Sequence, residues 1–329
     1  MVKTVFVTGG AGFIGRELTK KLLATEHQVV CMDLDHQFAR HAEFFSGLQP
    51  NENLTLARGT TLDRKRLSGW RRGADTVVHL AAMLGVQRTE ENRLRCLKFN
   101  VMGTDMVASA CALGNVGHLI FASSSEVYGE PTRNPVKESD ETKGKTVYAV
   151  SKLAGEELVK GYNQLFPKMN FTIARLFNTY GEGQVAQFVM ARFVKAVLAG
   201  ENPTLFGDGT QLRSYGHVDD IADGLIAVIH NPVSHSKTYN LGNSAEISSL
   251  KDLARKVIDI LAPGSGLEVD ILNSFEGSDR TREREVFARY CDNSLARREL
   301  GFNPSITLEE GIRRIAEAGI HHDDWPDRA

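Results

Sequence analysis

The stretch TGGAGFIG at residues 8–15 constrains the fold more than any other part of the sequence. It follows the apolar run TVFVT at 4–8 and opens a helical pattern over 14–25. Its glycines match the G-x-G-x-x-G spacing. Without side chains, such a turn can tighten until a pyrophosphate reaches backbone N–H groups at the start of the helix. The stretch therefore predicts a dinucleotide-binding strand–turn–helix unit.

An acidic residue stands where this unit would hold a ribose. Asp33 ends the apolar run QVVCMD at 28–33, 18 residues beyond Gly15. A carboxylate at the end of the second strand can accept hydrogen bonds from both ribose hydroxyls, and it repels a 2′-phosphate. We therefore expect NAD as the cofactor rather than NADP.

The order of apolar runs and helical patterns predicts a parallel sheet with helices on both faces. Near-continuous apolar runs are typical of strands that are buried on both sides, and their alternation with helices implies right-handed β-α-β units. We therefore predict an α/β fold with a Rossmann-type doubly wound parallel sheet. The expected strands are 4–8, 28–33, 76–82, 118–124 and 171–178, and the expected helices are 14–25, 103–113, 149–166 and 185–200.

The sequence changes in character after about residue 170, where Gly and Pro become more frequent and segments become shorter. We predict an NAD-binding domain over residues 1–170 and a smaller C-terminal α/β substrate lobe, mainly over 171–329. Segments at about 171–200 and 215–242 are expected to return to the first domain. Two helix N-caps are predicted in this part, Ser248 and Thr307.

Composition and charge restrict the class of protein. Hydrophobic residues make up 42% and charged residues 24%, as in ordinary globular chains. The formal net charge of −2 leaves no basic excess, so we expect no nucleic-acid partner. The 4 cysteines lie far apart without C-x-x-C, so we expect reduced thiols and no metal site. No signal peptide and no membrane-length apolar window are evident, which predicts a cytoplasmic protein without a membrane partner.

A tyrosine and a lysine in YAVSK, at 148–152, form a candidate catalytic pair. Tyr148 and Lys152 are four residues apart on a predicted helix and share one face. A phenol with a pKa of about 10 is a poor base at neutral pH. A neighbouring ammonium and a positively charged nicotinamide would favour the phenolate. Tyr148 could then accept the proton of a substrate hydroxyl while hydride leaves the same carbon.

Several motifs together resemble the extended short-chain dehydrogenase/reductase family, in its nucleotide-sugar epimerase/dehydratase branch. The resemblance covers about residues 1 to 310. It implies tightly bound NAD, a nucleoside-diphosphate sugar as substrate, and a transient 4-keto sugar. The motifs, in the family's order, are TGGAGFIG, VVHLAA, SSSEVYG, YAVSK, RLFNTYG and RSYGHVDD.

The resemblance also implies roles for individual residues. Ser124 corresponds to the family's catalytic Ser or Thr and would act with Tyr148 and Lys152. For the cofactor it implies Gly9, Gly12, Phe13, Ile14, Gly15, Asp33, Leu80, Ala81, Ala82 and Asn100, together with Tyr148 and Lys152. For the substrate it implies Met83, Ser124, Ser125, Asn178, Phe206, Arg213, Arg282 and Arg289.

Glu126 leaves the outcome of the reaction open. A 4-epimerase needs no carboxylate at this position, whereas the family's 4,6-dehydratases use a Glu there to abstract the C5 proton. Nucleotide-sugar decarboxylases also resemble S-x-S-E-V-Y-G, and Arg289 resembles their carboxylate-binding arginine. Many dehydratases carry Asp where this chain has Ser125. We favour 4-epimerisation, with decarboxylation or dehydration through Glu126 as the alternative; Glu126 could also merely order its loop.

Two further classes and an oligomeric state complete the expectations. A non-catalytic NAD-binding sensor on this fold would usually lack the Tyr148–Lys152 pair, which is intact, and Asp33 argues against a simple NADPH reductase. The helices at 97–113 and 149–166 resemble those of the family's dimeric four-helix bundle. We therefore expect a homodimer.

Overall fold

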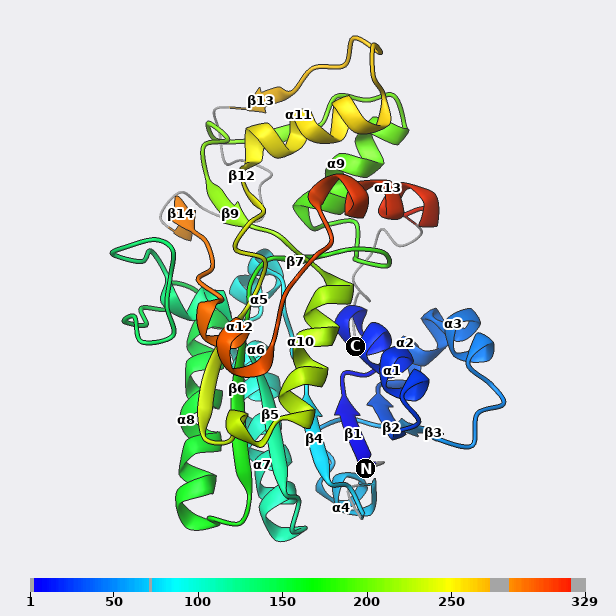
Figure 1. Cartoon of the computed structure of the whole chain (residues 1–329), viewed down its shortest axis with the longest axis vertical. Coiled ribbons are helices and arrows are strands. Elements are labelled where there is room, and N and C mark those ends of the chain that lie inside the picture. The colour runs from blue at the N-terminus through cyan, green and yellow to red at the C-terminus, as the bar shows by residue number, and fades with distance from the viewer. Residues whose placement is uncertain (1–2, 71–72, 273–283, 321–329) are drawn as a thin grey trace.

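The computed structural model describes residues 3–70, 73–272 and 284–320 (Figure 1). Within these residues, the main sheet has seven strands, all parallel to their neighbours. This confirms the predicted α/β fold with a Rossmann-type parallel sheet. In order across the sheet, the strands are β11 (Lys237–Leu241), β6 (Asn170–Leu176), β5 (His118–Ser124), β4 (Thr76–His79), β1 (Thr4–Thr8), β2 (Gln28–Asp33) and β3 (Leu54–Arg58).

Two expected strands are too long at their carboxyl ends, and one of them, 171–178, ends at Leu176. The predicted strand 76–82 ends at His79 because its neighbour β1 ends at Thr8. There the chain turns away at Gly9, whose φ of 71° lies in the left-handed region. Leu80, Ala81 and Ala82 consequently leave the sheet and line a cavity at its edge.

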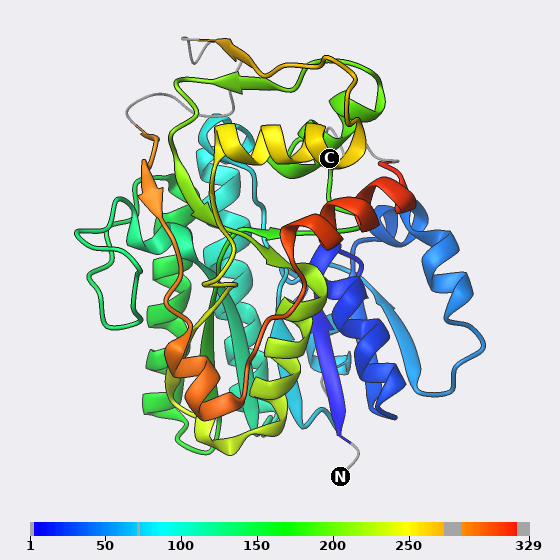
Figure 2. The ribbon, with the colours of Figure 1, turned by 45° about the horizontal axis from the view of Figure 1, so that its top comes forward.

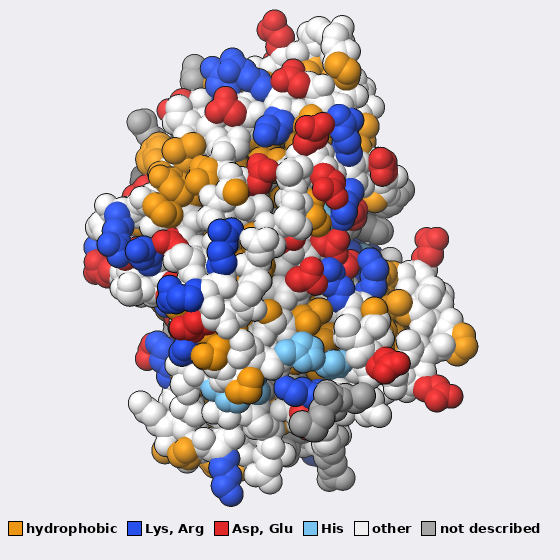
Figure 3. All heavy atoms as spheres, in the orientation of Figure 1, with side chains coloured by type: hydrophobic (Ala, Val, Ile, Leu, Met, Phe, Trp, Pro, Cys, Tyr) orange, Lys and Arg blue, Asp and Glu red, His pale blue; other side chains and the backbone are white. Residues whose placement is uncertain are grey.

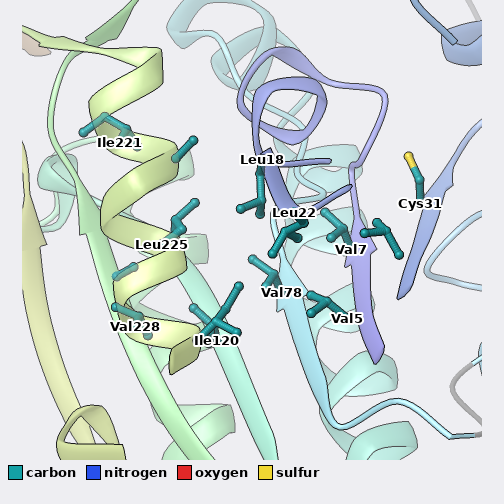
Figure 4. Packing of buried hydrophobic residues seen from close by; sticks show 14 of the residues in the cluster. Val5, Val7, Leu18, Leu22, Cys31, Val78, Ile120, Ile221, Leu225 and Val228 are labelled. Atoms are coloured by element: carbon teal, nitrogen blue, oxygen red, sulfur yellow. The ribbon is translucent and has the colours of Figure 1, made fainter. Parts of the chain in front are cut away.

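Helices cover both faces of the sheet, as the doubly wound fold requires. Successive residues of β1 alternate between the two layers: Val5 and Val7 pack into one apolar cluster and Phe6 into the other. Figure 4 shows the first cluster, in which Leu18 and Leu225 meet the sheet. The first face carries α1 (Phe13–Ala24), α10 (Val218–His230) and α12 (Ser294–Leu300), and the second carries α4 (Arg64–Trp70), α7 (Gly103–Leu113) and α8 (Val147–Leu165).

The N-terminus of α8 is fixed by a side-chain cap. The Thr146 hydroxyl accepts a hydrogen bond of 3.0 Å from the backbone N–H of Ala149, which satisfies one of the free donors of the first turn. The other short helical segments are α2 (Asp35–Arg40), α3 (Ala42–Gly47), α5 (Val86–Glu91), α6 (Arg93–Leu97), the π-helix η1 (Lys98–Met102), and the 3-10 turns η2 (Ser125–Tyr128) and η3 (Pro232–Ser234).

A smaller lobe covers the carboxyl-terminal edge of the sheet (Figures 1 and 2). Its apolar core joins α9 (Val189–Leu198), α11 (Leu250–Leu261) and α13 (Leu308–Ala318). Short strands complete it: β8 (Thr204–Phe206) pairs with β13 (Asp270–Leu272), β9 (Leu212–Ser214) with β12 (Ile247–Ser249) and β14 (Ala288–Arg289), and β7 (Thr179–Tyr180) with β10 (Gly216–His217).

One of the two predicted N-caps in this lobe is wrong. Thr307 caps α13 by accepting the N–H of Glu310 at 3.2 Å. Ser248, however, lies in β12 opposite Arg213, and the next residue, Ser249, caps α11 through the N–H of Asp252 at 3.0 Å. Strand pairing therefore decides between two adjacent serines.

Segments far apart in the sequence build each part of the molecule. β6, β11 and α10 belong to the sheet layers, whereas α9 packs in the core of the lobe. The division at residue 170, with returning segments at 171–200 and 215–242, stays a prediction. Acidic and basic side chains are interspersed over the face in Figure 3. No helix in the described ranges is long and apolar enough to span a bilayer.

Candidate active site

A cavity of about 1110 Å³ lies between the sheet edge and the lobe. It runs from the glycine loop after β1, past the end of β5 and the start of α8, to β8 and β9. Nearly all of the predicted site residues line it: Gly9, Gly12, Phe13, Ile14, Gly15, Asp33, Leu80, Ala81, Ala82, Met83, Ser124, Ser125, Glu126, Tyr148, Lys152, Asn178, Phe206, Arg213 and Arg289. Arg282 lies outside the described residues.

The glycine loop has the close backbone approach that a dinucleotide needs. α1 begins at Phe13, directly after Gly12, and no side chain caps it. A Cβ on Gly9 would lie 2.7 Å from the backbone nitrogen of Ala81, and one on Gly15 would overlap the Gly9 carbonyl oxygen. Gly9 and Gly15 therefore leave no room for side chains beside the start of the 12-residue helix α1, which lines the cavity. This cradle suits a diphosphate.

Asp33 supplies the acidic group at the rim of this cradle. Its carboxylate accepts the backbone N–H groups of Leu34 at 2.8 Å and Ala11 at 3.0 Å. Burial raises the pKa of Asp33 to about 6, although these two hydrogen bonds and the Arg16 guanidinium oppose the rise. The ionised carboxylate can accept ribose hydroxyls at neutral pH, as expected for NAD.

Tyr148 and Lys152 meet at the floor of the cavity. The Lys152 ammonium donates to the Ala122 carbonyl at 2.7 Å and lies 5.7 Å from the centre of the Tyr148 ring. Burial lowers the pKa of Lys152 to about 8, while Cys96 and Glu156 oppose this change. Without the cofactor, burial and then the Glu126 carboxylate raise the pKa of Tyr148, while the Ser124 hydroxyl opposes the rise. A lower pKa beside bound nicotinamide stays a prediction.

The three serines of SSSEVYG have different surroundings. Ser124 ends β5, accepts the N–H of Glu126 at 3.2 Å and lies close enough to Tyr148 to lower the pKa of its phenol. Ser123 points away from the cavity's centre and donates to the Glu156 carboxylate at 2.6 Å, which the sequence did not indicate. Ser125 is buried in η2 and lines the cavity. Ser124 alone therefore combines exposure to the cavity with contact to the phenol.

Glu126 faces the cavity but is also part of the wall. Its Oε2 accepts a hydrogen bond of 3.0 Å from the Thr146 hydroxyl, the same hydroxyl that caps α8. This contact joins η2 to the helix that carries the catalytic pair. Glu126 therefore anchors η2 to the N-terminus of α8.

Two arginines lie side by side at the substrate end. Arg213 on β9 and Arg289 on β14 are register partners, and both are buried. Arg213 donates to the Glu285 carboxylate at 3.0 Å, and Arg289 donates to the Gly129 carbonyl at 3.4 Å, next to η2. In these contacts, Glu285 is the carboxylate beside the pair, and guanidinium groups are the side chains best suited to bind a diphosphate.

Other cavity residues were missed at the sequence level. Gln211 and Tyr215 flank Arg213 at a spacing of two, so all three side chains fall on one face of β9. The Gln211 Oε1, the Tyr215 hydroxyl and the Asn178 Oδ1 are buried and have no hydrogen-bond partner among the described residues. Unpaired buried polar atoms are expected where a ligand binds. The period-two pattern QLRSY could have identified the first two residues.

Asn100 does not line the cavity. Its side chain accepts the N–H of Met83 at 2.7 Å and donates to the Met83 carbonyl and the Ser151 hydroxyl, both at 2.9 Å. It therefore holds Met83, a cavity residue, against α8 from one layer behind. A direct cofactor contact of Asn100 stays a prediction.

The wall beside Asp33 also lacked a sequence signal. It is formed mainly by α2 and includes His36, Gln37 and Arg40. No sequence motif marks these residues, and they reach the cavity only through the packing of α2.

The fold and the glycine loop define an enzyme that binds a dinucleotide at the carboxyl-terminal edge of a Rossmann-type sheet. The chain belongs to the NAD dependent epimerase/dehydratase family, whose sequence model matches residues 5–242. NAD is its cofactor.

Relatives within this family have several activities. The chain is 31% identical to a putative UDP-glucose 4-epimerase of Methanocaldococcus jannaschii, over 94% of this chain and 96% of that protein. It is 30% identical to UDP-glucuronic acid decarboxylase 1 of Arabidopsis thaliana, over 94% and 68% of the two chains. UDP-glucuronic acid 4-epimerase from Bacillus cereus, solved with UDP-glucuronic acid and NAD, superposes with a TM-score of 0.84 at 28% identity, covering 96% of this chain and 98% of that one.

Proposed function

We propose that this protein is a 4-epimerase of a nucleoside-diphosphate sugar, a UDP-hexose or a UDP-hexuronate, and that it acts through a transient 4-keto sugar. One observation carries the proposal. The Tyr148 phenol, whose pKa the neighbouring Ser124 hydroxyl lowers, lies in one continuous cavity with the glycine loop at one end and Arg213 at the other. This arrangement supports a sugar held between a cofactor and a diphosphate-binding lobe.

In this proposal, Tyr148 accepts the proton of the sugar C4 hydroxyl, and Ser124 orients that hydroxyl. The Lys152 ammonium lies close enough to favour the phenolate. The chemistry of NAD, when bound, is hydride exchange with C4. Bound NAD would supply the hydride to the opposite face of the 4-keto sugar, and Tyr148 would give the proton back to the C4 oxygen, so that C4 is inverted.

The diphosphate and the base occupy the lobe in this proposal. Arg213, Asn178 and the unpaired groups of Gln211 and Tyr215 surround the diphosphate and its ribose. Phe206, with the Arg192 guanidinium 5.2 Å from its ring centre, lies at the end where the base would bind. Arg282 and Arg289 are proposed to add charge at the diphosphate and the sugar.

The contact between Glu126 and Thr146 favours epimerisation over a lyase reaction. A carboxylate that abstracts a C5 proton must reach the sugar, whereas Oε2 of Glu126 is hydrogen-bonded at the N-terminus of α8. Ser125, in place of an acid, offers no strong proton donor for a departing water.

Product analysis with UDP-glucose and UDP-glucuronate tests the proposal. We expect C4 epimers from at least one substrate, and we expect Tyr148→Phe to abolish turnover. Glu126→Gln should leave epimer formation within about threefold of the parent rate, because a role in ordering the loop survives an isosteric amide. Turnover by Tyr148→Phe near the parent rate would contradict the proposed mechanism.

Decarboxylation of a UDP-hexuronate is the second candidate. The observation in its favour is that Arg289 is buried in the cavity wall, bonded to the Gly129 carbonyl beside η2, where it could hold a sugar carboxylate. The 4-keto hexuronate would then lose CO₂ with the help of Glu126. A UDP-pentose product that disappears in Glu126→Gln would establish this alternative instead.

We further propose that the enzyme works as a cytoplasmic homodimer through a four-helix bundle. Large apolar side chains are exposed along the continuous helix α6–η1–α7 and on α8, with Leu94 84% and Leu165 77% exposed. Val150→Glu, on the exposed side of α8, should yield monomers in sedimentation velocity. Val233→Glu, exposed on η3, is the matched control and should stay dimeric. A parent protein that sediments as a monomer would rule out the dimer.

A further inference from the structure

The segment from Ser123 to Tyr128, which carries Ser124 and Glu126, is called the catalytic turn below. A buried ion pair lies just behind this turn and has no part in the mechanism proposed above. Glu156 on α8 is 1% exposed and Arg175 on β6 is 6% exposed. The guanidinium donates from Nε to Oε1 at 2.9 Å and from Nη2 to Oε2 at 2.7 Å, so the pair is bidentate. Neither residue lines the cavity. Buried ion pairs are often no more stable than apolar replacements, so burial alone does not explain this pair.

The pair holds one end of the catalytic turn. Glu156 Oε1 also accepts the hydroxyl of Ser123 at 2.6 Å, and Ser123 is the register partner of Arg175 across β5 and β6. Ser123 lies between Ala122, whose carbonyl accepts Lys152, and Ser124. The end of β5 is therefore attached to α8 at two successive residues.

The same pair holds the other end of the turn. Arg175 Nη1 donates to the Tyr128 hydroxyl at 2.9 Å and to the Glu138 carbonyl at 3.1 Å. Tyr128 donates in turn to Asn240 at 2.7 Å. Ser123 and Tyr128 bracket both Ser124 and Glu126, so one ion pair fixes both ends of η2 relative to α8.

We propose that Glu156, together with Arg175, is a positioning residue that fixes Ser124 against Tyr148 and keeps a negative charge beside Lys152. The inference rests on the proposed roles of Tyr148, Ser124 and Lys152. Misplacement of a catalytic group by about 1 Å can lower a rate by about 100-fold. Binding of the nucleotide sugar, which depends on the lobe, is not affected by this pair.

The charge of Glu156 acts on Lys152, which has several other titratable groups around it. Lys152 is surrounded by Glu156 one turn later on α8, Cys96 from α6, His79 from β4 and Tyr148 from its own helix. Of these groups, Glu156 is the carboxylate that favours the ammonium. Without it, Lys152 should lose its proton at a lower pH, so activity should decline earlier on the alkaline side.

Two variants and a control separate the position of Ser124 from the charge beside Lys152. Ser123→Ala removes one hydrogen bond and leaves the ion pair. The double variant Glu156→Gln/Arg175→Met removes both charges without leaving either one unpaired, so it should fold. Glu157→Gln is the control, since Glu157 is exposed on the same helix and pairs only with Lys160 among the described residues, at 2.6 Å. Folding is checked by circular dichroism and by the NAD content of the purified protein.

The assay is epimerisation of UDP-glucose or UDP-glucuronate, followed as kcat and KM across pH. Ser123→Ala should lower kcat about tenfold with KM within about twofold and the pH profile unchanged. The double variant should lower kcat further and move its alkaline limb by about half a pH unit or more toward lower pH. Glu157→Gln should match the parent.

Two results distinguish failure of this inference from failure of the proposed function. If the folded double variant keeps the parent kcat and pH profile while Tyr148→Phe is inactive, the positioning role is wrong and the function stands. If the parent epimerises neither substrate, or Tyr148→Phe stays active, the proposed function falls, and the role of Glu156 falls with it.

Discussion

Acidification should weaken the binding of NAD to this enzyme, and Asp33 should be the cause. The ionised carboxylate can accept both hydroxyls of a ribose, whereas its protonated form has lost an acceptor. Burial raises the pKa of Asp33 to about 6, so protonation begins well above the usual range for an aspartate. In the test, the pH at which NAD binding is measured is lowered from about 8 to about 5.

The size of the effect follows from that pKa. If only the ionised form binds NAD, the apparent Kd grows by the factor 1 + 10^(pKa − pH), which is about tenfold at about pH 5 and equals about 1.4 kcal/mol. The stability of the NAD-free protein should change in the opposite direction. Because the folded state binds this proton more tightly than the unfolded state, Asp33 contributes stability as the pH falls from about 6 to about 4.

Calorimetric titration of NAD into cofactor-free protein across this pH range is the assay. Asp33→Asn should bind NAD more weakly at neutral pH and show a flat profile. His36 also lines the cavity near Asp33, and burial and Arg40 lower its pKa, so His36→Gln is the control and should keep the parent slope. An affinity of the parent that is independent of pH, or a slope that persists in Asp33→Asn, would refute the reasoning.

Three further predictions concern other parts of the site. Gly15→Ala should yield protein without bound NAD, because the new Cβ overlaps the Gly9 carbonyl oxygen. Gly161→Ala is the control, since its Cβ meets no neighbour within 4 Å. This control should keep NAD and should raise the stability of the helix by about 0.5–1 kcal/mol in thermal unfolding. The kcat of the parent enzyme should decline above about pH 8, because Lys152 loses its proton there. Lys152→Met should lower kcat about 100-fold at neutral pH. Both are measured with the UDP-sugars named above. Arg213→Lys should raise KM about tenfold with little change in kcat, since lysine lacks the guanidinium that contacts Glu285 and that we propose binds the diphosphate. An unchanged KM would remove Arg213 from the proposed binding site.

Short-range features of the sequence determined much of the fold and the cofactor site. The glycine loop, Asp33 at a strand end, and the four-residue spacing of Tyr148 and Lys152 are local patterns with one structural solution. The matching bounds of β1, β2 and β5 reflect the same principle, because buried parallel strands leave near-continuous apolar runs.

Features that depend on a distant neighbour were less accessible. The strand at 76–82 ends early because β1 ends beside it, and Ser249 rather than Ser248 caps α11 because Ser248 pairs with Arg213. The raised pKa of Tyr148 is a consequence of burial in the assembled protein and of the nearby Glu126 carboxylate, which no local spacing reveals. Asn100 presents the same problem, since its polar side chain is used one layer behind the cavity.

Three stretches that leave the sheet assemble the lobe: one between β6 and α10 and one between β11 and α12, both of which return to the sheet layers, and one after α12 that ends in the lobe with α13. Transplanting the whole lobe from a relative would therefore demand several simultaneous splice points, each joined to unchanged strands or helices. Swapping a single stretch, such as the one carrying β8 and β9, needs only two. New sugar or base preferences in this scaffold should thus be easier to engineer segment by segment than by exchange of a module.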